Sequence, residues 1–140
     1  MQDVFLGSLI YNDRFDCYRC EIEFKGNIVT IDLFLEGKDD LKSLFTITRK
    51  ILTELHVLDK KAKTFIAGEY LDIYNKNLRD KNSSLISKIE FSKYLKLEGI
   101  LIYISGLKEF CYNDGNLFLG HSLIAKLGDS LDFINVSLFG

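Results

Sequence analysis

The chain has 140 residues, contains no proline and carries a formal net charge of −2. Hydrophobic residues make up 47% of it and charged residues 27%, which excludes disorder as its dominant state and excludes a collagen-like or Pro-rich protein. The length predicts a single domain over residues 1–140. With 18 Lys and Arg against 20 Asp and Glu, the chain lacks the basic excess typical of nucleic-acid-binding domains. We therefore expect no nucleic-acid partner.

The N-terminal residues and the cysteine content bear on the compartment. Residues 1–7 lack the basic and apolar regions of a signal peptide, and an apolar run such as residues 100–104 is too short to cross a bilayer. Three cysteines are too few for a secreted disulfide scaffold. We expect a cytoplasmic protein with reduced thiols and no membrane partner.

The first third of the chain reads as strands. Residues 4–11 are a candidate strand, and residues 18–24 and 28–35 alternate apolar and polar side chains, as half-buried strands do. Between the last two, Lys25, Gly26 and Asn27 predict a turn and hence an antiparallel hairpin.

Helical spacing follows in the middle third. Residues 41–55 predict a helix that Asp39 or Asp40 caps, residues 56–59 predict a break that leaves His56 exposed, and residues 60–78 predict a second helix. Ser87 and Glu90 form a capping-box pattern for a short helix over residues 88–96, which would bury Ile89, Phe91 or Tyr94, and Leu95.

Strand signals return at the C-terminal end, over residues 100–104, 109–113, 117–126 and 131–139. Asp114 and Gly115 predict a hairpin turn between the second and third of these strands. Because runs of strands flank a run of helices, the sequence predicts an α+β fold. We expect a mainly antiparallel sheet, built from the N- and C-terminal strands and packed against two or three central helices.

Two groups of residues invite chemical hypotheses. Cys17 and Cys20 have a spacing seen at zinc sites, but residues three apart on a strand point to opposite faces and no second pair follows, so we expect no metal and no cofactor. His121 with Asp114 or Glu109 could serve as an acid–base pair. No recognisable nucleophile elbow accompanies them, and a structural histidine that joins two strands is the favoured interpretation.

Residues 112–124 resemble the signature of an uncharacterised bacterial family, domain of unknown function 2262. The positions that carry the resemblance are Asp114, Gly115, Phe118, Gly120, His121 and Ser122. No catalytic activity is implied by this resemblance. Small bacterial families of this type often include immunity proteins, which bind a toxin domain and block its active site.

The leading hypothesis is therefore a non-enzymatic protein that binds and neutralises a toxin domain, with no catalytic residues. Asp39, Asp40, Tyr74 and Asp80 are candidate partner-binding residues, because exposed acidic and aromatic side chains suit an interface. The alternative is a small enzyme that uses His121 with Asp114 or Glu109. The sequence leaves open whether the protein is a monomer or a homodimer.

Overall fold

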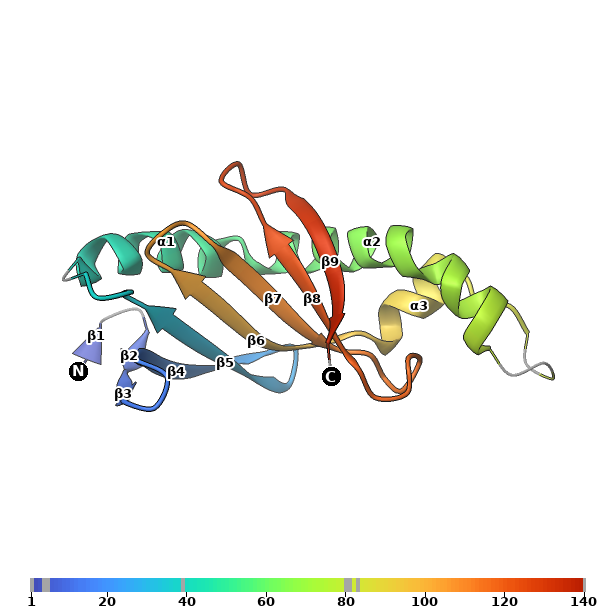
Figure 1. Cartoon of the computed structure of the whole chain (residues 1–140), viewed down its shortest axis with the longest axis horizontal. Coiled ribbons are helices and arrows are strands. Elements are labelled where there is room, and N and C mark those ends of the chain that lie inside the picture. The colour runs from blue at the N-terminus through green and yellow to red at the C-terminus, as the bar shows by residue number, and fades with distance from the viewer. Residues whose placement is uncertain (1, 4–5, 39, 80–81, 83, 140) are drawn as a thin grey trace.

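The computed structural model describes residues 2–3, 6–38, 40–79, 82 and 84–139. Its elements follow one another along the chain in the order strands, helices, strands (Figure 1). They are β1 (Gln2–Asp3), β2 (Gly7–Ser8), β3 (Ile10–Asn12), β4 (Cys17–Phe24), β5 (Asn27–Phe34), α1 (Leu41–Thr53), α2 (Leu55–Ile73), the π-helix η1 (Tyr74–Leu78), α3 (Lys88–Tyr94), β6 (Lys96–Tyr103), β7 (Lys108–Asn113), β8 (Ser122–Leu127) and β9 (Phe133–Phe139).

A seven-stranded sheet is the main layer, with the strands in the order β3-β4-β5-β6-β7-β8-β9. Its neighbouring strands are antiparallel except for β5 and β6, which are parallel. This arrangement confirms the predicted α+β fold with a mainly antiparallel sheet. The parallel pair arises because the whole helical segment forms the crossover between the N-terminal hairpin and the C-terminal strands.

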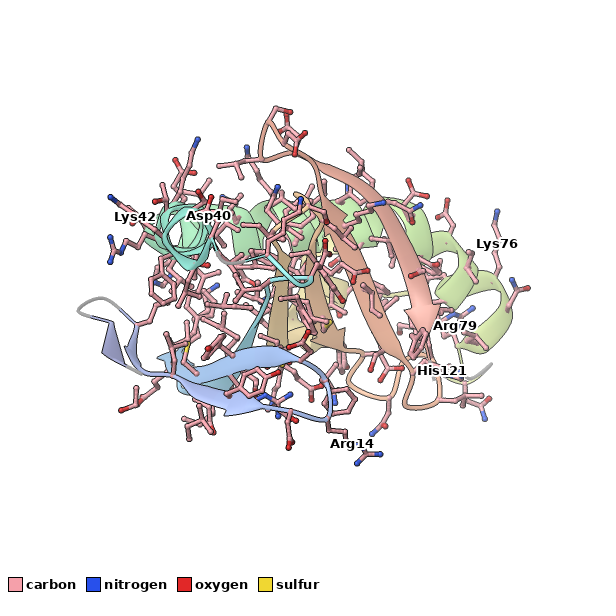
Figure 2. All side chains as sticks on the ribbon, turned by 60° about the vertical axis from the view of Figure 1, so that its left-hand side comes forward. Arg14, Asp40, Lys42, Lys76, Arg79 and His121 are labelled. Atoms are coloured by element: carbon pink, nitrogen blue, oxygen red, sulfur yellow. The ribbon has the colours of Figure 1, made fainter. Side chains whose placement is uncertain are left out.

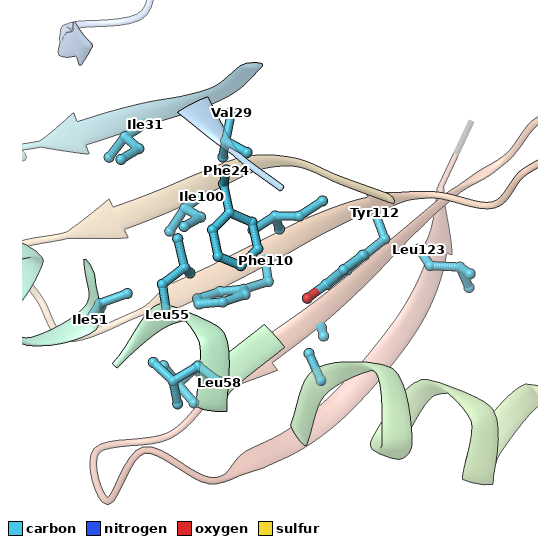
Figure 3. Close-up of a cluster of buried hydrophobic side chains, with 14 of the residues drawn as sticks. Phe24, Val29, Ile31, Ile51, Leu55, Leu58, Ile100, Phe110, Tyr112 and Leu123 are labelled. Carbon is cyan, nitrogen blue, oxygen red and sulfur yellow. The ribbon is translucent and has the colours of Figure 1, made fainter. Parts of the chain in front are cut away.

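One face of the sheet is covered by α1 and α2, which lie along it nearly end to end (Figure 1). Apolar residues that alternate along the strands from β4 to β8 point to this face and meet the helices there (Figure 3). The largest fully buried side chains include Tyr112, Phe91, Phe110, Ile31, Leu33, Leu58 and Ile66. The core therefore joins strands from both ends of the chain to the central helices.

The boundary between α1 and α2 differs from the prediction. His56 and Asp59 lie in the first turns of α2 and not in a turn between helices, because only Glu54, with φ −102° and ψ 17°, separates α1 from α2. Leu55, Leu58 and Ala62 are buried at helical spacing, so the apolar stripe continues through the predicted break. His56 is exposed, as expected.

In α3, the predicted capping box is present: Ser87 accepts from the Glu90 backbone N–H, and Glu90 accepts from the Ser87 backbone N–H. Phe91 and Leu95 are buried, but Ile89 is 72% exposed, so its predicted burial is wrong. The helix has only seven residues and turns one face to the core, which leaves Ile89 on the opposite side.

The predicted strand over residues 117–126 is also too long, because β8 begins only at Ser122. Residues 115–120 form a run of turns instead, in which Asn116, Leu119 and Gly120 have positive φ. Extended strands require negative φ, so these residues cannot pair with β7.

Candidate functional site

The signature residues from Asp114 to His121 lie in the loop between β7 and β8, and Ser122 begins β8. Asp114 stands at the start of this loop with an exposed fraction of 1%, and its carboxylate accepts hydrogen bonds from the backbone N–H groups of Asn116 (2.8 Å) and Phe118 (2.9 Å). The side chain thus satisfies backbone donors that a loop would otherwise leave unpaired. Asp114 is a structural anchor of this loop.

Phe118 lies in the core, with an exposed fraction of 2%. Its ring meets the rings of Tyr70 (5.6 Å between centroids), Tyr74 (6.2 Å) and Phe91 (6.1 Å), all in edge-on arrangements. Such contacts add to the energy of burial. Phe118 therefore fastens the signature loop to α2, η1 and α3.

Gly115 is required by both space and backbone conformation. Its φ is +61°, and a Cβ placed there would lie 2.7 Å from the carbonyl oxygen of Tyr94. The end of α3 therefore packs directly against the loop backbone. Gly120 also has a positive φ, of +83°, but a Cβ there would make only an ordinary contact with the Asn116 side chain, at 3.8 Å.

His121 immediately precedes β8 and is half-buried. Its ring Nδ1 and its backbone N–H both bond to the carbonyl oxygen of Phe118, and since a carbonyl only accepts, Nδ1 carries the proton. This bond lies within the loop. The prediction that His121 joins two strands is therefore wrong, because its ring bonds to Phe118, three residues earlier in the chain. Ser122 follows as the first residue of β8, opposite Asn113 of β7.

The structure does not assemble the alternative acid–base pair. His121 has no hydrogen bond or ion pair with Asp114 or Glu109 in the described part of the chain. Glu109 lies opposite Lys126, at the far end of the β7–β8 pairing from Ser122. The carboxylate of Asp114 is occupied by the loop backbone.

The candidate partner-binding residues do not form one patch. Asp40 caps α1 by accepting from the backbone N–H of Ser43 (3.1 Å), and this bond and one from the Ser43 hydroxyl lower the pKa of its carboxyl group. Tyr74 lies beyond the far end of α2, half-buried against Phe118. Figure 2 shows Asp40 and the η1 residue Lys76 at opposite sides of the molecule. Asp39 and Asp80 lie outside the described residues.

A second candidate site is a cleft that sequence reasoning missed. It consists of two cavities of about 450 Å³ and about 190 Å³ that share Lys25, Lys63 and Lys93 among their lining residues. We call it the lysine cleft, and it lies where α2, α3, the β4–β5 turn and the start of β6 meet. Its lysines are Lys25, Lys60, Lys63, Lys88, Lys93 and Lys96.

Asp59 forms the floor of the lysine cleft, with no exposed side-chain surface. One carboxylate oxygen accepts from the Tyr112 hydroxyl (2.6 Å), and the other lies 2.7 Å from the Lys25 ammonium and 3.4 Å from that of Lys63. Burial and the neighbouring Asp59 charge raise the pKa of Tyr112. Figure 3 shows Tyr112 among the apolar core residues, with its hydroxyl end directed toward the helix layer.

A helical reading of residues 55–62 could have found Asp59, which the sequence prediction instead placed in the break at residues 56–59. It occupies a position next to Leu58 on the buried stripe of α2, where a lone carboxylate needs a partner. Lys60 and Lys63 stand close together in the sequence, but the other four lysines come from segments that only the folded chain brings beside them.

Across the described positions, no group of three or more His, Cys, Asp or Glu side chains is placed to hold a metal ion. Cys17 and Cys20 are buried, and neither forms a disulfide with a described cysteine. Of the helices in the described chain, none has both the length and the apolar character needed to cross a bilayer.

Comparison with known proteins identifies a family but no characterised relative. No curated protein and no solved structure matches the chain. Residues 3–137 match the family described as "Uncharacterized protein conserved in bacteria (DUF2262)". Because the match covers nearly the whole chain, the protein belongs to this bacterial family of unknown function, as residues 114–122 had indicated.

Proposed function

We propose that this protein is a non-enzymatic binding protein that neutralises a cognate toxin domain. The observation that carries the proposal is that Asp114, Phe118 and His121 of the signature all make contacts that hold the loop in place. Asp114 binds the loop backbone, Phe118 fills the aromatic cluster, and His121 bonds to the Phe118 carbonyl. These contacts account for the signature by folding alone.

The same contacts argue against the acid–base alternative. A general base needs a free ring nitrogen, a substrate within hydrogen-bond reach and a group that orients it. The imidazole of His121 keeps Nε2 free, but neither Asp114 nor Glu109, the two carboxylates that the alternative names, bonds to its ring. Binding of a partner requires none of these features.

The three cysteines also suit this role in the cytoplasm of the producing cell, where an immunity protein meets its toxin. The described structure has none of the three in a disulfide, and Cys17 and Cys20 are buried. Free thiols persist in a reducing compartment.

The test is co-expression with the toxin domain encoded by a neighbouring gene. Cells that make the toxin domain alone should stop growing, and cells that also make this protein should grow, with the two proteins eluting together in gel filtration. A neighbourhood that encodes no toxin, together with failure to protect against any candidate, would refute the proposal.

His121→Asn supplies the matched control. Asparagine keeps an N–H donor near the position of Nδ1 but cannot transfer protons at neutral pH. Protection that survives this change is the expected result, and protection that depends on the imidazole would favour the enzyme.

A further inference from the structure

The lysine cleft concentrates positive charge in a chain whose net charge is −2. The larger cavity is lined by Lys25, Lys60, Lys63, Lys88 and Lys93 together with His56, and the described residues lining it include no carboxylate. Clefts lined by charge of one sign focus the electrostatic field and attract oppositely charged ligands. The remainder of the chain is net acidic, so this attraction is directional.

The charge of the cleft is not cancelled from within. Asp59 is the carboxylate at its floor, and it is already shared by Lys25, Lys63 and the Tyr112 hydroxyl. Glu90, on the neighbouring α3, accepts from the Ser87 backbone N–H and is not among the residues that line either cavity.

Three further lysines of the cleft are free to bind. Lys60, Lys88 and Lys93 are exposed, and within the described part of the chain none of them forms an ion pair.

Asp59 also organises the site. Because it is held by Tyr112 from β7, it fixes the Lys25 ammonium, on the β4–β5 turn, against α2. The Lys25 side chain remains 45% exposed, so it stays accessible from the cleft. Two lysines are thus positioned by the fold, and the other lysines surround them on flexible side chains.

Apolar side chains border the lysines. Ile89 lines the larger cavity and is 72% exposed. Val57 lies on α2, three residues before Lys60, and is 58% exposed. Charged residues around exposed apolar side chains are typical of protein interfaces. Nucleic-acid sites instead favour arginines and exposed aromatic rings for stacking, and the described residues lining the cleft include no arginine.

We propose that the lysine cleft binds a carboxylate-rich segment of a partner protein, with Ile89 and Val57 taking its apolar side chains. This inference rests on the proposed function and specifies the chemistry of the partner surface. The complementary charge would speed association and select acidic partners.

The experiment measures binding of a fluorescently labelled peptide rich in Glu and Leu by anisotropy, at low and high salt. The comparison peptide has Gln in place of every Glu, and an oligothymidylate of equal charge tests the nucleic-acid alternative. The cleft variant is Lys60→Gln/Lys88→Gln/Lys93→Gln, and the matched control is Lys42→Gln/Lys50→Gln/Lys76→Gln, which makes the same charge change outside the cleft.

The expected result is an affinity for the acidic peptide that falls about ten-fold in the cleft variant, changes less than about two-fold in the control variant and weakens with salt. Equal losses in both variants would overturn the inference, because net charge alone would then explain binding. Tighter binding of the Gln peptide or the oligothymidylate, or no binding of the acidic peptide, would overturn it as well.

Growth protection separates this inference from the proposed function. If the cleft variant protects cells as well as the wild type, the protein neutralises its toxin through another surface and the cleft inference fails. If the wild type gives no protection, the proposed function fails while the peptide titration still tests the cleft.

Discussion

Tyr112→Phe removes one hydroxyl group from the interior and leaves the ring in place. In the native protein this hydroxyl donates to Asp59 over 2.6 Å, and neither side chain is exposed to solvent. A hydrogen bond to a charged group contributes about 1.5–3 kcal/mol, and the loss leaves a buried carboxylate oxygen without its donor. Lys25 and Lys63 still compensate the charge, so we expect the free energy of unfolding to fall by about 2 kcal/mol.

Urea denaturation followed by circular dichroism measures this change in free energy. In a thermal melt, the melting temperature of a domain of this length should fall by about 7 °C. Tyr103→Phe is the matched control. Tyr103 is half-buried and stacked on Phe34 at 4.4 Å, and its hydroxyl has no hydrogen bond within the described residues. Its removal should change the stability by less than about 0.5 kcal/mol. Equal stability of Tyr112→Phe and the wild type would refute the reasoning that the buried carboxylate depends on this donor.

Three further predictions concern backbone space, thiol reactivity and pH. Gly115→Ala should destabilise the protein, because the new Cβ would meet the Tyr94 carbonyl. Gly68→Ala, in open space on α2, should stabilise it by up to about 1 kcal/mol. Thermal melts compare the two variants, and a Gly115→Ala variant as stable as the wild type would contradict the geometry.

Burial raises the pKa of Cys111 to about 12 from 9.0. Iodoacetamide should therefore alkylate this thiol at pH 8 far more slowly in the native protein than in urea. Equal rates of alkylation would disprove the shift. The hydrogen bonds from Ser43 lower the pKa of Asp40 in the folded protein. The ionised cap therefore stabilises the fold at pH values above the ordinary pKa of 3.8, and this contribution is lost as the pH falls through the lowered pKa. Asp40→Asn keeps a capping side chain, so its urea midpoint should lose this pH dependence, and an unchanged acid profile would contradict the assignment.

Local patterns predicted most of the elements. The alternation in residues 18–24 and 28–35 specified the β4–β5 hairpin, and Ser87 with Glu90 specified the start of α3. The predictions that were wrong concern places where tertiary contacts override local signals. Asp59 looked like a helix break but is buried on α2, because Tyr112 and Lys25 satisfy it from distant segments. Residues 117–121 were predicted as part of a strand but form a loop. The Asp114 carboxylate accepts from the Phe118 backbone N–H, and the Phe118 ring packs in the aromatic cluster.

The candidate sites divide in the same way. The residues of the signature loop could be identified from the sequence, because Asp114, Gly115 and His121 act on neighbours within a few residues of the chain. The partner of His121 could not, since the turn that brings its ring to the Phe118 carbonyl depends on positive φ at Leu119 and Gly120.

By itself, the sequence determined the α+β class, the approximate positions of the helices and strands, and membership of the bacterial family, because these follow from periodicity and short motifs. Only the tertiary structure decided the parallel pairing of β5 with β6 and the assembly of the lysine cleft. Both depend on the long helical crossover, which places the turn after β4 beside α3 and the start of β6. The charge is nearly balanced over the whole proline-free chain, but the fold brings six of its lysines together around the buried Asp59.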